Sequence, residues 1–156
     1  MSAQDVIMPL LTKNRKAIFV IIFVLLLDQF TKYLVYKFLF PDKVIKLLPF
    51  LNLVYVENTG VAFGMFKSLP AGFFIVVTTI ITFFVIYLFF KDRQNWFVYS
   101  LIIAGALGNT ADRIIHGYVI DFIDLHAWVF HWPAFNVADS AISIGVVLFI
   151  YKSFKK

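Results

Sequence analysis

The feature that most constrains this fold is the apolar run Leu69–Phe90, which carries no charged side chain and ends at Lys91, Asp92 and Arg93. A helix of about 20 residues crosses roughly 30 Å of hydrocarbon, so the run predicts a membrane-spanning helix. The rest of the chain agrees, because 62% of its 156 residues are hydrophobic, whereas a soluble domain has about 45–50%. We therefore expect an α-helical integral membrane protein without a large soluble core.

Further apolar segments predict a bundle of four transmembrane helices in one membrane-embedded domain, residues 1–156. The expected spans are residues 17–36, 69–90, 96–115 and 135–151. The first span resembles the apolar region of a secretory signal, but Asp28–Lys32 follows where a cleavage site would need small residues, and apolar sequence resumes to Phe40. We expect this helix to remain uncleaved.

The basic residues indicate the topology. Most of them fall on one side of the membrane if both termini are cytoplasmic, as the positive-inside rule favours: Lys13, Arg15, Lys16, Lys91, Arg93, Lys152, Lys155 and Lys156. The other side keeps Lys37, Lys43, Lys46 and Lys67. We expect cytoplasmic N- and C-termini. These flanking positions also explain the net charge of +5, so no nucleic-acid surface is expected.

The segment Lys43–Phe66, between the first and second spans, has a different composition. Its β-branched and aromatic residues in Leu51–Val56 are bounded by prolines and by the turn-like Asn58–Gly60, which favours short strands. We expect a small extracytoplasmic β-sheet on the outer membrane face, between helices 1 and 2. The aromatic segment His126–Trp132, between the third and fourth spans, is typical of the headgroup level.

Two aspartates, Asp121 and Asp139, stand against membrane-like sequence in the last third of the chain. A carboxylate there costs about 3 kcal/mol on insertion scales, so it marks a candidate functional site. When two carboxylates share a site, one keeps a proton while the other acts as a base on a water molecule. The pair therefore predicts the chemistry of an aspartic protease. Asp124 is a third acid in the same loop, and the residues alone separate it poorly from Asp121.

Other polar residues have structural interpretations that compete with a role in a site. Asp28 and Lys32 are four residues apart on one helix face, where they can neutralise each other. Asp112 and Arg113, near the outer end of the third span, can form a local ion pair that ties helices together. Asp139 can cap the fourth helix, because a helix N-terminus stabilises a carboxylate.

Three asparagines favour a built site over these structural interpretations. Asn58, Asn109 and Asn136 lie on separate segments that the predicted topology brings to the same outer side as Asp121 and Asp139. Convergent polar groups in an otherwise apolar bundle are typical of a binding or active site. Motifs for other chemistries are missing from the sequence: it has no cysteine, no H-E-x-x-H zinc site, no phosphate-binding loop and no G-x-S-x-G elbow.

These residues stand in motifs that resemble the lipoprotein signal peptidases, or signal peptidase II, of the bacterial cytoplasmic membrane. The motifs run in the family's order: Asp28-Gln29-Phe30-Thr31-Lys32, Asn58-Thr59-Gly60-Val61-Ala62-Phe63, Gly105–Arg113, Gly117–Phe122 and Phe135–Asp139. Each is weak alone, but the ordered set covers nearly the whole chain and is specific. One mild departure is Ala106, where the family often has a glycine.

The resemblance implies an intramembrane aspartyl endopeptidase that cuts diacylglyceryl-modified prolipoproteins just before the lipidated cysteine. Asp121 and Asp139 would be the catalytic dyad. The support and substrate-binding residues would be Asp28, Lys32, Asn58, Gly60, Asn109, Asp112, Arg113 and Asn136. The resemblance implies no metal or organic cofactor and predicts inhibition by globomycin. We expect a functional monomer whose partners are lipidated substrates and membrane lipids, with its active site near the outer face.

Two other classes compete with the peptidase. A small proton-coupled membrane transporter also uses intramembrane acids, but four spans without an evident inverted repeat disfavour it. A purely structural membrane protein would tolerate the loss of single aspartates. The peptidase hypothesis also predicts apolar flanks for the substrate lipid, at Phe63, Phe66, Trp128 and Trp132.

Overall fold

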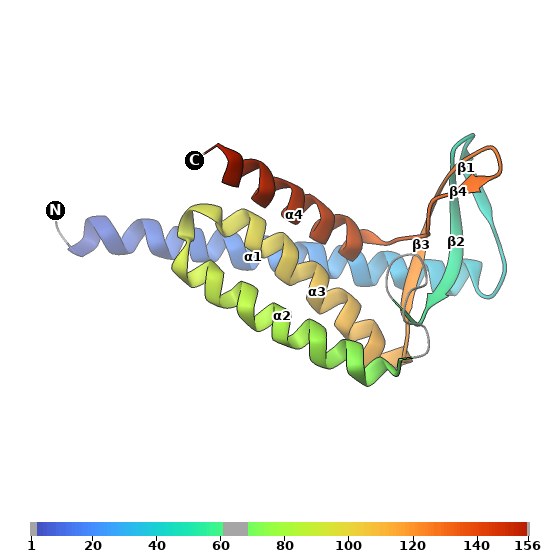
Figure 1. Cartoon of the computed structure of the whole chain (residues 1–156), viewed down its shortest axis with the longest axis horizontal. Coiled ribbons are helices and arrows are strands. Elements are labelled where there is room, and N and C mark those ends of the chain that lie inside the picture. Colours follow the sequence, from blue (N-terminus) through green and yellow to red (C-terminus); the bar gives the residue numbers. More distant parts are fainter. Residues whose placement is uncertain (1–2, 61–68, 156) are drawn as a thin grey trace.

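The computed structural model describes residues 3–60 and 69–155, and the side chains from residue 12 onward. Within these residues, four long helices form a bundle and a small sheet lies at one end of it (Figure 1). The helices are α1 (Ala3–Leu39), α2 (Ala71–Lys91), α3 (Trp96–His116) and α4 (Val137–Phe154). The strands are β1 (Ile45–Leu48), β2 (Leu51–Asn58), β3 (Val119–Ala127) and β4 (Phe130–His131).

The helices have the surface of a membrane protein, which confirms the predicted fold class. In α1 the segment Thr12–Leu39 is long and apolar enough to cross a membrane, as are α2 and α4. These helices expose large apolar side chains, for example Phe19 (69%) and Phe83 (67%). Helix α3 is as long as α2, with 21 residues, but polar residues in its last turns lower its hydropathy.

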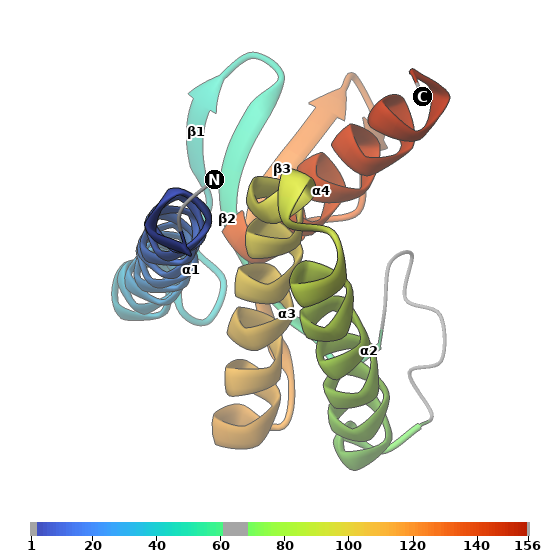
Figure 2. The ribbon, with the colours of Figure 1, turned by 90° about the vertical axis from the view of Figure 1, so that its left-hand side faces the viewer.

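Helix α3 is the central element and packs against α1, α2 and α4 (Figure 2). Glycine allows α3 and α4 to approach closely, because a Cβ atom at Gly105 would lie 2.3 Å from the carbonyl oxygen of Ala138. Side chains from residue 98 to residue 113 of α3 are mostly buried by the neighbouring helices. The polar end of α3 therefore faces the bundle interior, where a membrane protein keeps its ionisable groups.

The predicted small sheet is present, and two of its four strands lie between the first two helices as expected. Strands β1 and β2 do lie there, but β3 and β4 come from the connection between α3 and α4, and all pairs are antiparallel in the order β1-β2-β3-β4. The β2–β3 pairing places Val56 opposite Asp121. Strands so distant in sequence pair through tertiary contacts that local composition does not reveal. The sheet thereby brings both connections to the same end of the bundle.

The element boundaries also differ. Helix α1 runs from Ala3 to Leu39 and so extends beyond both ends of the expected span, residues 17–36. Helix α4 begins at Val137 because Asn136 is its N-cap. Both termini and the α2–α3 connection lie at the end opposite the sheet (Figure 1). Several residues of the sequence predictions lie outside the described residues: Val61, Ala62, Phe63, Phe66, Lys67 and Lys156.

Candidate active site

Asp121 is held on β3 by two asparagine side chains. Its neighbours Ile120 and Phe122 pack into the apolar cluster against α1, and the alternation of a strand turns Asp121 to the other face. The side chain amide of Asn58 donates to Oδ2 at 2.9 Å, and that of Asn136 donates to Oδ1 at 2.7 Å. Asp121 is only 1% exposed, so its charge depends on these contacts.

Asp139 both caps α4 and reaches the same polar cluster. Its backbone N–H donates to Asn136 Oδ1 at 2.8 Å, and its Oδ2 accepts from the backbone N–H of Asn136 at 3.3 Å. This reciprocal pair is a capping box, so the capping interpretation is correct. Its other oxygen, Oδ1, accepts from the side chain amide of Asn109 at 2.7 Å. Capping therefore leaves half of the carboxylate for the cluster.

Asn136 connects the two carboxylates and is completely buried. Its side chain nitrogen donates to Asp121 and also lies 3.2 Å from Asn109 Oδ1. Its backbone N–H donates to Asp139. The structure thus brings Asn58, Asn109 and Asn136 around the two acids, as the sequence predicted.

A buried ion cluster lies behind the two acids. Lys32 Nζ lies 2.8 Å from Asp28 Oδ2 and 2.9 Å from Asp112 Oδ2, and the three side chains are at most 2% exposed. The same ammonium donates to Asn109 Oδ1 at 3.1 Å. Lys32 therefore neutralises Asp28, as the structural interpretation predicted, but it pairs with Asp112 as well. Among the described residues, Asp112 pairs with Lys32 and not with Arg113, so the predicted Asp112–Arg113 pair is wrong.

The ion cluster also forms hydrogen bonds with the two segments that carry Asp121 and Asp139. Asp28 Oδ1 accepts from the backbone N–H of Ala138 at 2.9 Å, one residue before Asp139. Asp112 Oδ2 accepts from the backbone N–H of Ile120 at 3.1 Å, one residue before Asp121. These contacts fix the start of α4 and the start of β3 relative to α1 and α3.

Gln29 is a member of this cluster that the sequence predictions missed. Its side chain amide donates to Asp112 Oδ1 at 2.9 Å and lies 3.2 Å from Asp28 Oδ2. It also approaches the carbonyl oxygen of Gly108 at 3.3 Å. Its place inside the first motif, between Asp28 and Lys32, was the one available signal, because its partner Asp112 lies on another helix.

Arg113 binds the turn after β2 instead of an aspartate. Its Nη2 donates to the carbonyl oxygen of Gly60 at 2.9 Å, and its guanidinium lies 5.2 Å from the ring centre of Phe74. The backbone N–H of Gly60 in turn donates to Asn58 Oδ1 at 3.0 Å. The buried Nε of Arg113 has no hydrogen-bond partner among the described residues. Arg113 thus ties the end of α3 to the turn after β2.

Asp124 points to a different set of partners. It accepts from the side chain amide of Asn52 at 2.9 Å and pairs with His131 Nδ1 at 2.7 Å. Although burial opposes the effect, these hydrogen bonds and the His131 charge hold the pKa of Asp124 below its ordinary value. Asp124 is therefore a carboxylate of the sheet and does not join Asp121 and Asp139. The predicted flank residue Trp128, at 95% exposure, projects from the β3–β4 turn.

The environment of Asp121 favours its protonated form. Burial is the largest cause, and the negative charge of Asp139 adds to it, so that together they raise the pKa of Asp121 to about 7. The hydrogen bonds from Asn58 and Asn136 oppose this effect but do not cancel it. Two acids with such different partners can carry one proton between them near neutral pH, which is the charge state that acid–base catalysis on water needs.

Comparison with known proteins identifies the family. A family model described as signal peptidase (SPase) II matches residues 20–155. The chain is 71% identical over 136 residues to the lipoprotein signal peptidase of Thermodesulfovibrio yellowstonii, covering 87% of this chain and 92% of that relative. It is 42% identical over 143 residues to the lipoprotein signal peptidase of Blochmanniella pennsylvanica, covering 87% of each.

Solved structures show the same fold. Two structures described as a bacterial membrane enzyme, determined by the in meso method at 2.3 Å and 1.9 Å, match with TM-scores of 0.84 and 0.81. Each is 36% identical and covers 90% of this chain, and the chain covers 88% and 94% of them. Fold and relatives together define a bacterial membrane peptidase. The chain belongs to the signal peptidase II family, which confirms the resemblance of its motifs.

Proposed function

We propose that this chain is an intramembrane aspartyl endopeptidase of the bacterial cytoplasmic membrane. Its substrates are prolipoproteins that already carry a diacylglyceryl group, and it removes their signal peptides by cutting just before the lipidated cysteine. The observation that carries the proposal is the placement of Asp121 and Asp139 on one asparagine, Asn136, which contacts both carboxylates. The curated relatives are named lipoprotein signal peptidases, which supports this class of substrate.

In the proposed reaction the two aspartates divide the acid and base roles. Ionised Asp139 takes a proton from a water molecule, whose oxygen attacks the scissile carbonyl carbon, while protonated Asp121 gives its proton to the carbonyl oxygen. The tetrahedral intermediate then breaks its carbon–nitrogen bond. Asp139 gives its proton to the leaving amine, and a hydroxyl proton of the intermediate returns to Asp121. The raised pKa of Asp121 supports this assignment of the acid.

Residues around the dyad hold the reactants in place. We assign Asn58, Asn109 and Asn136 to orienting the carboxylates, and Asp28, Lys32 and Asp112 to the ion cluster that supports them. Arg113 and Gly60 form one edge of the substrate site, where Nε of Arg113, which has no partner among the described residues, can donate to a substrate carbonyl. No step in this mechanism uses a metal or an organic cofactor.

The proposal includes a topology. All four helices cross the membrane, with α3 tolerated as a span because the other helices surround its polar end. Both termini are cytoplasmic, and the sheet end with the dyad lies at the outer face. A transmembrane signal peptide with two acyl chains would then deliver its scissile bond at the depth of Asp139. The monomer contains the complete set of proposed site residues and is the proposed functional unit.

The substrate assignment is tested with matched prolipoproteins that differ only in the diacylglyceryl group. Purified protein is incubated with each, and the products are measured by mass spectrometry. Each buried methylene contributes about 0.8 kcal/mol, so the modified substrate is expected to be cut far faster, with the lipidated cysteine as the new N-terminus. Globomycin is expected to block the reaction. Equal cleavage of both substrates, or cleavage at another bond, would reject the substrate assignment.

A further inference from the structure

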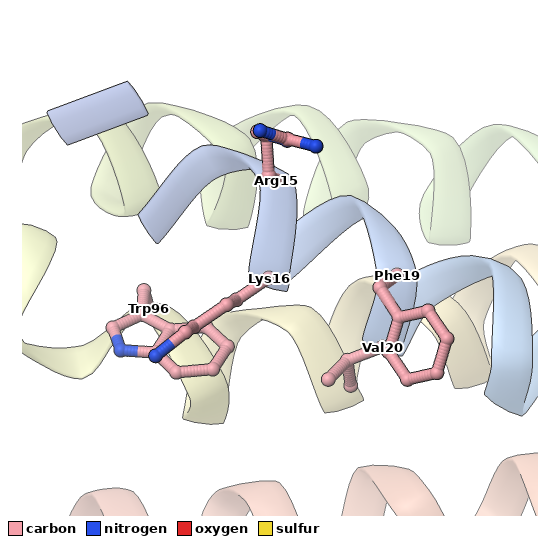
Figure 3. Close-up of a pocket in the computed structure, with 5 residues that line it drawn as sticks. All are labelled: Arg15, Lys16, Phe19, Val20 and Trp96. Carbon is pink, nitrogen blue, oxygen red and sulfur yellow. The ribbon is translucent and has the colours of Figure 1, made fainter. Parts of the chain in front are cut away.

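A pocket lies at the end of the bundle opposite Asp121 and Asp139. It has a volume of about 400 Å³ and is lined by Arg15, Lys16, Phe19 and Val20 of α1 and by Trp96, the first residue of α3. In Figure 3, Lys16 extends from α1 toward the Trp96 indole, and Phe19 and Val20 lie further along α1. This pocket shares no residue with the proposed catalytic machinery.

Two cationic side chains, Arg15 and Lys16, line the pocket. Arg15 and Lys16 are exposed, and neither takes part in an ion pair within the described part of the chain. Asp92 lies in the nearby α2–α3 connection, and its carboxylate binds the side chains of Asn95 at 2.6 Å and Tyr99 at 3.3 Å. Arg93 of the same connection donates to Asn14 on α1, which adds a further cation.

The position of the pocket along α1 corresponds to the boundary between headgroups and hydrocarbon. Arg15 and Lys16 directly precede the apolar stretch that begins at Ala17, and the exposed rings of Phe19 and Phe23 stack with their centres 6.1 Å apart. Tryptophan prefers this interfacial depth. A cationic mouth thus continues into an exposed aromatic ridge, which matches a molecule with an anionic head and apolar chains.

We propose that this pocket binds the phosphate headgroup of an anionic membrane phospholipid. Arg15 and Lys16 contact the phosphate, Trp96 lies against the glycerol region, and the acyl chains follow Phe19 and Phe23. Basic pockets between transmembrane helices are suited to anionic headgroups, because the cations remain at headgroup depth and are little screened there. The apolar wall selects a lipid over a soluble anion, since inorganic phosphate would leave the ridge exposed.

The test measures lipid binding by native mass spectrometry of the purified full-length protein in detergent. The protein is titrated with phosphatidylglycerol, and separately with phosphatidylcholine, whose phosphate is balanced by its choline. The double variant R15Q/K16Q is compared with K152Q/K155Q, which removes the same charge from the same end of the bundle but from α4, outside the pocket. Glutamine is a good helix former, so both variants keep α1 and α4 helical.

We expect that the phosphatidylglycerol molecule that binds most tightly occupies this pocket. Its Kd should rise by about tenfold or more in R15Q/K16Q, because two contacts to the phosphate are lost. The Kd in K152Q/K155Q should change by less than about twofold, and millimolar inorganic phosphate should not displace the lipid. An equal loss of phosphatidylglycerol affinity in the two variants would show that overall charge causes the binding, and it would overturn the proposed lipid site. Unchanged binding in R15Q/K16Q, equal binding of phosphatidylcholine or displacement by phosphate would overturn it as well.

Discussion

At the scale of single residues, the surroundings of Asp121 determine its charge state and make the stability of the protein depend on pH. Its pKa is raised from the ordinary 3.8 to about 7 by burial and by the charge of Asp139. Between these values the native protein holds a proton that the unfolded chain has released. The contribution of Asp121 to stability therefore falls as pH rises from about 4 to about 7, and its capacity to act as an acid falls as pH passes 7.

We predict that kcat/KM declines on the alkaline side as pH rises through about 7, because Asp121 then loses the proton that the proposed mechanism assigns it to donate. On the acidic side it declines when the partner carboxylate takes up a proton. The two limbs belong to the coupled pair. The measurement is kcat/KM against pH with a lipidated substrate, with D124N as the control, whose profile should be the same. A flat profile across pH 5 to 9, in protein that stays folded, would contradict the shared proton.

Lys32 supports a second prediction at this scale. K32M would leave Asp28 and Asp112 buried without their cation, and breaking a buried ion pair costs about 3–5 kcal/mol of unfolding free energy. The exposed K155M serves as a control and should change it by less than about 0.5 kcal/mol. Both are measured by denaturant unfolding in the same detergent. Similar stability of K32M and K155M would mean that the ion cluster does not hold the bundle together.

At the scale of elements, the contact between α3 and α4 determines where Asp139 lies. A Cβ atom at Gly105 would meet the carbonyl oxygen of Ala138 at 2.3 Å and Ile142 Cγ1 at 2.7 Å. Backbone cannot move aside as a flexible side chain can, so a methyl group here must push the helices apart. Ala138 also donates its N–H to Asp28, so the shift would reach the ion cluster and the dyad.

We predict that G105A lowers the free energy of unfolding by about 1–3 kcal/mol through overpacking. Both the melting temperature and the cleavage rate should therefore fall. G72A is the matched control, because a Cβ at Gly72 of α2 meets nothing within 4 Å and alanine favours a helix. G72A should leave cleavage unchanged and keep or raise the melting temperature. If G105A behaved like G72A, the close helix contact would not matter for the site.

The strands show what local sequence could predict and what it could not. The composition of residues 51–56 predicts a strand, whereas no strand is predicted at β3. In a strand, Asp121 and Asp124 fall on opposite faces because they are three residues apart. That spacing alone would have separated the two acids. The pairing of β2 with β3 joins distant segments, and no local signal reveals it. Gln29 was missed for a related reason, since its partner Asp112 lies on another helix.

At the scale of the whole molecule, the fold divides the chain into a lipid-exposed bundle and a polar end. The apolar runs predicted the helices, because a helix that crosses a membrane needs about 20 mostly apolar residues. The polar end was predicted as a set of residues, since motif order places Asp121, Asp139 and the asparagines together. Their individual hydrogen bonds could not be predicted, because they depend on the rotation of each helix and on the sheet register.

The central claim is that Asp121 and Asp139 act as one catalytic pair, and it is tested most directly by cleavage kinetics of D121N, D139N and D124N. The amide keeps the shape of the side chain and an acceptor oxygen but cannot act as a general acid or base. D121N and D139N should each lower kcat by at least roughly a hundredfold with melting temperatures close to that of the parent protein. D124N, whose carboxylate binds Asn52 and His131, should retain most activity. Near-native turnover by D121N or D139N would contradict the account.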